Sequence, residues 1–109
     1  MTIKELTQLI LKQAEEKGWG TNAKKIIVAE KIALIHSEIS EAFEGYRHKN
    51  INRRHGFKEE IGDALTRILH LCGVLDVDIE KAVLKKLKIN KKRIWNRNKL
   101  NELSLRKIK

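Results

Sequence analysis

The sequence contains no proline, six glycines and one cysteine, and aromatic residues make up only 5% of its 109 positions. Turn-rich β-sheets usually need more proline and glycine than this, so their scarcity favours an all-helical chain. The single cysteine, Cys72, excludes a disulfide framework within one chain and suits a reducing environment. With so few aromatic residues, the core must consist mainly of isoleucine, leucine, valine and alanine.

Long apolar runs are also missing. No stretch approaches the ~20 residues that a membrane-spanning helix needs. The N-terminus has the pattern of an amphipathic helix and lacks the apolar segment of a signal peptide. We therefore expect a cytoplasmic protein of one domain. A chain of this length buries a limited core, so pairing with a second copy, as a homodimer or homotetramer, would add stability.

Positive charge is concentrated at one end of the sequence. The formal net charge is +10, yet residues 1–80 contain 12 Lys and Arg against 13 Asp and Glu, a net of −1. Residues 81–109 contain the other 12 basic residues and one acid, Glu102, a net of +11. We expect such a segment to meet an anion, which would be the phosphates of a small molecule, a nucleic acid or an acidic partner.

The spacing of apolar residues predicts four main helices, which we expect to form an all-α bundle that is completed by oligomerisation. Thr2 and Glu5 form a capping box at the start of the first helix, and Asp78 is the expected N-cap of the fourth. We assign residues 1–97 to the domain and residues 98–109 to a basic C-terminal tail or a short helix. The expected helices lie between Thr2 and Gly18, from about Ala23 to Tyr46, from near Phe57 to Gly73 or Leu75, and from Asp78 to about Trp95.

One six-residue pattern occurs twice, 22 residues apart. Residues 38–43 read Glu-Ile-Ser-Glu-Ala-Phe, and residues 60–65 read Glu-Ile-Gly-Asp-Ala-Leu. Acids three positions apart lie on one face of a helix, and both pairs flank the apolar stripe on the same side. If the loop between the second and third helices turns the chain back antiparallel, one cavity can receive all four acids, namely Glu38, Glu41, Glu60 and Asp63.

Four carboxylates beside an apolar seam repel one another, so either they extend into water or a cation holds them together. The Glu-x-x-His pattern of di-iron bundles is absent, which leaves only oxygen ligands. Oxygen ligands suit a hard dication, Mg²⁺ or Mn²⁺, better than Zn²⁺ or iron. The alternative is that these acids are the ordinary solvated faces of amphipathic helices.

Glu38-Ile-Ser-Glu41 on one helix and Glu60-Ile-Gly-Asp63 on the next form an E-x-x-E motif followed by an E-x-x-D motif. This arrangement resembles the MazG-like all-α nucleoside triphosphate pyrophosphohydrolases. In the fourth helix, the segment with Lys86, Asn90 and Arg93 resembles the K-x-x-x-N-x-x-R segment of that family. The similarity extends over roughly residues 15–95.

The resemblance implies a helical dimer or tetramer that hydrolyses a nucleoside triphosphate to a nucleoside monophosphate and pyrophosphate. It also implies that the four motif acids are Mg²⁺ ligands. One of them, Glu38 or Glu41, is expected to position or deprotonate the attacking water, and the sequence leaves both open.

Further candidate substrate contacts lie outside the acid motifs. Lys86, Asn90 and Arg93 share one face of the fourth helix, where they would contact phosphate oxygens or form a solvated basic face. Trp19 would stack on a base or anchor its loop in the core. The histidines show no metal-ligand spacing and are expected to fill surface or core positions; they are His36, His48, His55 and His70.

A second interpretation belongs to a different class of protein, a small nucleic-acid-binding helical protein that uses its basic C-terminal segment. That segment contains Trp95 as its one aromatic residue and no recognisable reading motif. Four converging carboxylates have no use in such a protein, because they would repel the phosphate backbone. The duplicated acid pair therefore favours the metal-dependent enzyme.

Overall fold

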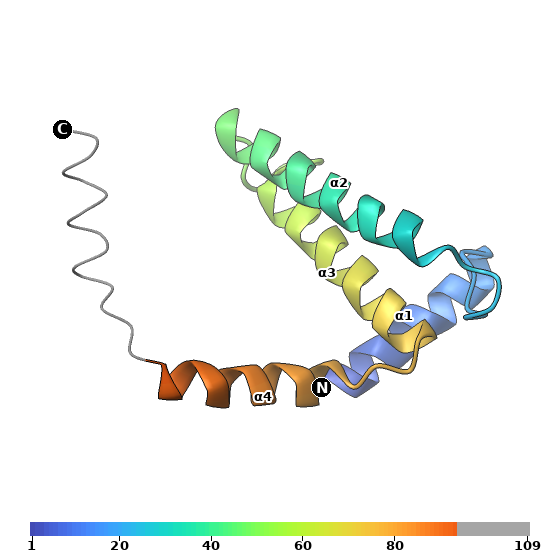
Figure 1. Ribbon diagram of the computed structural model, residues 1–109. Coiled ribbons are helices and arrows are strands. Elements are labelled where there is room, and N and C mark those ends of the chain that lie inside the picture. Colours follow the sequence, from blue (N-terminus) through green and yellow to red (C-terminus); the bar gives the residue numbers. More distant parts are fainter. Residues whose placement is uncertain (94–109) are drawn as a thin grey trace.

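The structure, a computed structural model, describes residues 1–93. In this range the chain forms four α-helices and no strand: α1 (Ile3–Lys17), α2 (Val28–Arg47), α3 (Phe57–Val74) and α4 (Ile79–Lys92). Figure 1 shows α2 and α3 side by side as an antiparallel hairpin, with α1 across one end of α3. The all-helical prediction is confirmed for these residues, and none of their helices is long and apolar enough to cross a lipid bilayer.

Both ends of α1 follow the predicted signals. Thr2 Oγ1 accepts a hydrogen bond from the Glu5 N–H at 3.1 Å, and the Glu5 carboxylate accepts one from the Thr2 N–H at 3.4 Å. Gly18 closes the helix with a φ of 73°, in the left-handed region that glycine adopts without a steric penalty. Gly73 of α3 faces α1, where an added Cβ would lie 2.8 Å from Leu11 Cδ1. Glycine at this position therefore lets α1 and α3 approach closely.

The second helix begins at Val28, five residues later than predicted. The residues before it form a turn around Asn22, whose side-chain oxygen accepts a hydrogen bond from the Lys24 N–H at 2.9 Å. The Asn22 carbonyl accepts another from the Lys25 N–H at 2.9 Å. Asparagine offers the backbone such local partners in place of helical ones, and here this outweighs the helix propensity of the Ala-Lys-Lys run that follows.

Two glycines allow α2 and α3 to meet closely at the closed end of the hairpin. Gly45 lies in the last turn of α2, which continues to Arg47, and a Cβ there would lie 2.8 Å from the Phe57 amide nitrogen. At Gly56, a Cβ would lie 2.6 Å from Asn50 Oδ1. The backbone of Asn50 joins the two sides, since its N–H donates to the Gly45 carbonyl and its carbonyl accepts from the Phe57 N–H, each at 2.8 Å.

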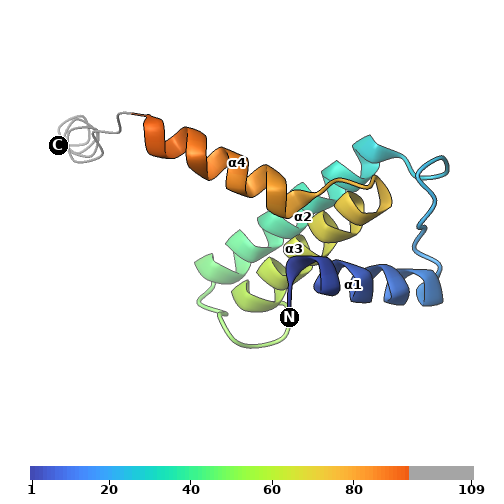
Figure 2. The same cartoon turned by 90° about the horizontal axis from the view of Figure 1, so that it is seen from below.

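Helix α4 lies apart from the hairpin, so the described chain does not close into one four-helix bundle (Figures 1 and 2). Asp78 caps it as predicted, with its carboxylate accepting a hydrogen bond from the Lys81 N–H at 3.0 Å. The helix ends at Lys92, before the expected limit at Trp95. Trp95, the predicted boundary after residue 97 and the predicted basic tail lie outside the described residues.

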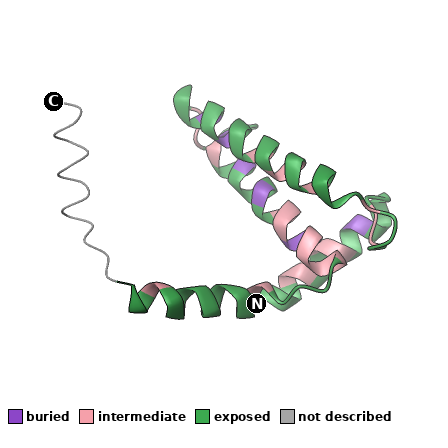
Figure 3. Ribbon diagram, in the orientation of Figure 1, coloured by how far each residue is buried: buried purple, intermediate pink, exposed green. Residues whose placement is uncertain are grey.

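Few side chains are buried in the single chain. Figure 3 shows the buried positions mainly along the α2–α3 hairpin, while α4 is largely exposed. Among the described residues the buried apolar positions are Ala14, Ala42, Ala64 and Leu69. Several large apolar side chains of the helices remain exposed. We call them the exposed apolar stripes: Ile32, Ile39, Phe43 and Tyr46 of α2, Ile61 and Leu65 of α3, and Val83 and Leu87 of α4.

Candidate metal centre

The α2–α3 hairpin brings the two acid pairs together, as the matched motif spacing suggested. Glu38 and Glu41 come from α2, and Glu60 and Asp63 come from α3. All four line one cavity of about 670 Å³ between the helices. Because the helices are antiparallel and held close at Gly45 and Gly56, the two motifs lie opposite each other.

Three of the four acids form a compact cluster. One carboxylate oxygen each from Glu38, Glu60 and Asp63 lies within 4.8 Å of the other two. Glu60 is buried, with 2% of its surface exposed, and the Glu38 side chain is 12% exposed. Glu41 and Asp63 are exposed on the same cavity. The cluster therefore has a buried floor, made by Glu38 and Glu60, and an open rim.

The buried floor lacks hydrogen-bond donors. Glu38 Oε2 and Glu60 Oε2 are both inaccessible to solvent, and neither has a hydrogen-bond partner within the described part of the chain. Glu38 Oε1 is better satisfied, because it accepts a hydrogen bond from Arg67 Nε of α3 at 3.0 Å. Buried acceptor oxygens without a donor require either a proton on one of the carboxyl groups or a cation beside them.

The pKa values of the two acids shift in opposite directions. A hydrogen bond to Glu38, then burial, then the nearby Glu41 and Asp63 raise the pKa of Glu60 to about 8. Burial alone would raise the pKa of Glu38, but hydrogen bonds from Glu60 and Arg67 and the Arg67 charge hold it below its ordinary value. At neutral pH without a cation, Glu60 is therefore the acid of the pair that is expected to be protonated.

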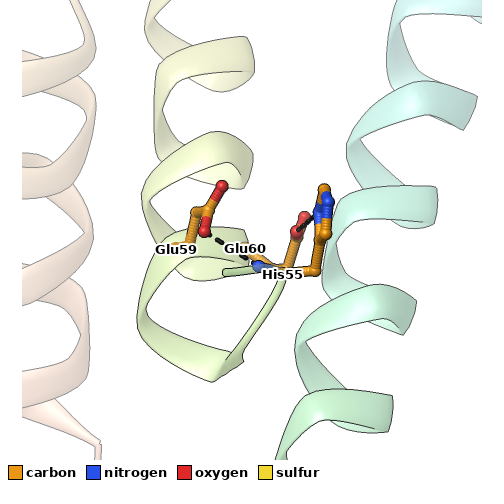
Figure 4. Close-up of side chains that lie close together, drawn as sticks. All are labelled: His55, Glu59 and Glu60. Carbon is orange, nitrogen blue, oxygen red and sulfur yellow. Dashed lines mark hydrogen bonds and ion pairs between the residues drawn. The ribbon is translucent and has the colours of Figure 1, made fainter. Parts of the chain in front are cut away.

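A histidine that sequence reasoning missed lies beside this cluster. His55 is in the loop before α3, and its Nδ1 lies 3.5 Å from Glu60 Oε1, while its backbone N–H donates to Glu59 Oε2 at 2.9 Å (Figure 4). The spacing of four and five residues to these acids crosses the turn at Gly56. Helical periodicity says nothing about such a turn, so the sequence carried no signal for this contact.

Trp19 lies outside the acid cavity, beside a second and smaller one. This cavity of about 300 Å³ is lined by Trp19, Lys31, Thr66, Arg67 and His70. Two contacts hold the Trp19 loop against α2 and α3. Lys31 Nζ donates to the Trp19 carbonyl at 3.4 Å, and His70 Nε2 lies 2.8 Å from the Gly20 carbonyl oxygen. Arg67 lines this cavity and also binds Glu38, so it connects the two sites. The predicted core role suits His70, which is buried.

The three residues of α4 that were predicted to contact phosphate do not lie beside the acids within one chain. Lys86, Asn90 and Arg93 do not line the acid cavity. Lys86 and Arg93 are exposed, and Asn90 is half-buried. Their predicted phosphate contacts, like the predicted ligand role of the acids, stay predictions.

A comparison of the chain with models of protein families found no match, and neither did comparisons with curated proteins and with solved structures.

Proposed function

We propose that this chain is a Mg²⁺-dependent nucleoside triphosphate pyrophosphohydrolase whose metal ligands are Glu38, Glu41, Glu60 and Asp63. The observation that carries the proposal is the pair of buried oxygens, Glu38 Oε2 and Glu60 Oε2, which have no donor in the described range. A dication would satisfy both, and the donor set consists of oxygen atoms, as Mg²⁺ prefers. The motif resemblance to the MazG-like family connects such a cluster to triphosphate hydrolysis.

The acids would have different tasks. When bound, Mg²⁺ would offset the negative charge that develops during phosphoryl transfer. Glu38 and Glu60 would hold the ion at the buried floor of the cluster, and Asp63 would add a ligand from the next turn of α3. Glu41 faces the same cavity from an exposed position, so in addition to its proposed ligand role we assign to it the orientation of the attacking water and the acceptance of its proton.

The second cavity suits the base of the nucleotide. Trp19 is 53% exposed at this cavity and offers an aromatic surface for stacking. Arg67 lies between this cavity and Glu38, at the place where the sugar and α-phosphate would connect base and metal. Removal of the Trp19 ring should accordingly raise KM more than it lowers kcat.

A second copy of the chain would complete the site. The exposed apolar stripes of α2, α3 and α4 need cover, and two-fold pairing of helical faces is the commonest way to provide it. We propose a homodimer, or a pair of dimers, in which Lys86, Asn90 and Arg93 of one chain approach the acid cavity of the other. This would bring the basic face of α4 to the triphosphate that the acids hold through Mg²⁺.

The test is an assay of the purified chain with a panel of NTPs and dNTPs. We expect pyrophosphate and the corresponding monophosphate from at least one substrate, with Mg²⁺ or Mn²⁺ present and not with EDTA. Orthophosphate as the sole product, or activity that survives EDTA, would contradict the proposal. If hydrolysis is absent and the chain binds DNA or RNA with a steep dependence on salt, the nucleic-acid-binding interpretation is correct instead.

A further inference from the structure

His55, Glu59 and Glu60 form a second group of donor atoms beside the four acids. One donor atom from each lies within 4.8 Å of the other two, and all three residues line the same cavity as the acid cluster. Figure 4 shows the His55 ring next to the Glu60 carboxylate and the Glu59 carboxylate turned toward the His55 backbone. The hydrogen bond from the His55 N–H to Glu59 Oε2, at 2.9 Å, holds the loop against the first turn of α3.

Glu60 belongs to both groups and is not satisfied by either. It is 98% buried, and its Oε2 has no hydrogen-bond partner among residues 1–93. Its other oxygen, Oε1, faces His55 Nδ1 at 3.5 Å, which is too long for a good hydrogen bond. A buried carboxylate that faces an imidazole with one oxygen and also belongs to the compact acid cluster can contact a cation in either group.

We propose that His55, Glu59 and Glu60 form a cation position of their own, adjacent to the four-acid cluster and sharing Glu60 with it. This position has one nitrogen and two carboxylate donors. Imidazole nitrogen suits Zn²⁺ and similar transition-metal dications, whereas Mg²⁺ prefers oxygen ligands throughout. The position therefore selects a dication of the Zn²⁺ class over Mg²⁺.

The geometry requires only small movements. Donors that lie 2.0–2.2 Å from Zn²⁺ can be at most roughly 4.4 Å apart, since two such bonds in line span that distance. The three donor atoms are already within 4.8 Å of one another. His55 and Glu59 are exposed, so their side chains can rotate toward the ion, while Glu60 is fixed by its burial. The remaining coordination positions face the open cavity.

The experiment loads the full chain with Zn²⁺ in a large excess of Mg²⁺ and without nucleotide. After removal of loosely held metal, we expect one Zn²⁺ per chain by elemental analysis, and X-ray absorption at the zinc edge should show scattering from an imidazole ring. The variant is His55→Asn, because His55 has a φ of 60°, which asparagine also tolerates. It should weaken Zn²⁺ binding by at least about tenfold, the loss that even outer-shell changes cause.

The matched control is His48→Asn. His48 lines the same cavity but pairs with Glu44 at 3.2 Å and belongs to neither donor group, so its replacement should leave the bound Zn²⁺ unchanged. Glu59→Gln is a second variant, since glutamine can still accept the hydrogen bond from His55 while it removes a charged ligand; it should also lower Zn²⁺ affinity.

The proposal is wrong if His55→Asn retains one Zn²⁺ with imidazole scattering, or if Mg²⁺ displaces Zn²⁺ from the unmodified chain. This inference rests on the proposed metal centre only through Glu60, and the two fail separately. Zn²⁺ bound through His55 in a chain that hydrolyses no triphosphate would contradict the proposed function alone. Hydrolysis with Mg²⁺ in a chain whose Zn²⁺ binding does not depend on His55 would contradict this inference alone.

Discussion

Glu60 combines two properties that conflict in a folded protein, because it is an acid and it is 98% buried. A buried ionised carboxylate without a partner is expensive, so the residue must hold a proton or meet a cation. With a pKa of about 8, it holds the proton at neutral pH when no metal is bound. Metal binding must displace this proton, and proton release on addition of Mg²⁺ is therefore expected.

This protonation predicts an unusual dependence of stability on pH in EDTA. A carboxyl whose pKa rises from 4.5 to about 8 on folding binds more protons folded than unfolded between these values. Its stabilisation is full below pH 4.5 and is lost as the pH rises through 8. The free energy of unfolding should fall over this window, by at most ~1.4 kcal/mol per pH unit for one proton. The pKa of Glu38 is lowered, so this residue changes the free energy of unfolding only at pH values below the window.

Urea unfolding at a series of pH values measures this effect. The Glu60→Gln variant should show a flatter profile, because glutamine cannot titrate, and saturating Mg²⁺ should remove the fall in the unmodified chain. If the unmodified chain is equally stable across the window, or gains stability with pH, then Glu60 does not carry the proton assigned to it.

Under the proposed function, Arg67 would compete with Mg²⁺ for Glu38. Its Nε lies 3.0 Å from Glu38 Oε1, and its side chain is 40% exposed, so the interaction is partly screened by solvent. Arg67→Gln removes a positive charge beside the proposed metal ligands and should raise Mg²⁺ affinity about two- to fivefold, which corresponds to less than ~1 kcal/mol. Titration calorimetry without nucleotide measures this.

The same substitution at Arg47 is the control, because Arg47 pairs with Glu44, which is not in the compact acid cluster. Arg47→Gln should leave Mg²⁺ affinity unchanged. Weaker Mg²⁺ binding in Arg67→Gln would instead mean that Arg67 supports the site rather than competing with the ion.

The sequence predicted the acids of the site better than their neighbours. Glu38, Glu60 and Asp63 could be placed together because helical spacing and a repeated motif act within single helices. His55 and Arg67 could not. Their contacts with the acids depend on how the loop turns at Gly56 and how α3 faces α2, and residue spacing carries no information about either.

The hairpin of α2 and α3 is the element that creates the site, and its closed end depends on Gly45. A methyl group there would lie 2.8 Å from the backbone nitrogen of Phe57, and the backbone cannot easily give way. Gly45→Ala should therefore destabilise the chain by about 1–3 kcal/mol through overpacking. Gly62→Ala is the matched control, because an added Cβ at Gly62 meets nothing within 4 Å.

In the control, alanine should stabilise α3 by roughly 0.5–1 kcal/mol, since glycine in a helix has more conformational freedom to lose on folding. Urea unfolding of the two variants measures both changes. Equal effects at the two positions would mean that the close approach at Gly45 does not hold the hairpin together.

Helix existence was predictable, and helix boundaries were predictable only where a capping signal was clear. Thr2, Gly18 and Asp78 all act as predicted, because each cap is a local interaction. The predicted start of α2 was wrong, because the turn at Asn22 competes with the helix. The spacing of apolar residues does not reveal such a turn. The position of α4 relative to the hairpin depends on tertiary contacts and was not predictable.

At the scale of the whole molecule, the chain leaves much of its apolar surface uncovered. Phe43 and Tyr46 are 58% and 63% exposed, and Leu87 of α4 is 57% exposed. These side chains belong to helical stripes of the kind that normally face a core. We therefore expect light scattering to give a dimer or tetramer, and a monomer with full activity would contradict the shared site.

Mixing of inactive variants tests whether one site uses two chains. Asp63→Asn lacks a proposed metal ligand, and Arg93→Glu lacks the phosphate contact that we assign to the partner chain. In a two-fold dimer formed by co-refolding these variants, one site of each mixed dimer is intact, so about a quarter of the activity should return. A mixture of Asp63→Asn with Glu41→Gln is the control and should stay inactive, because both acids come from the same chain. No recovery in the first mixture would mean that α4 does not act across the interface.

The most direct measurement is hydrolysis in ¹⁸O-labelled water with Mg²⁺, followed by analysis of the products of the unmodified chain and of Asp63→Asn. We expect pyrophosphate, with the label in the nucleoside monophosphate, because water attacks the α-phosphorus. The rate should fall at least about a hundredfold in Asp63→Asn, since metal-ion stabilisation of the transition state is worth several kcal/mol. Label in pyrophosphate or orthophosphate, or an undiminished rate in Asp63→Asn, would contradict a pyrophosphohydrolase built on these four acids.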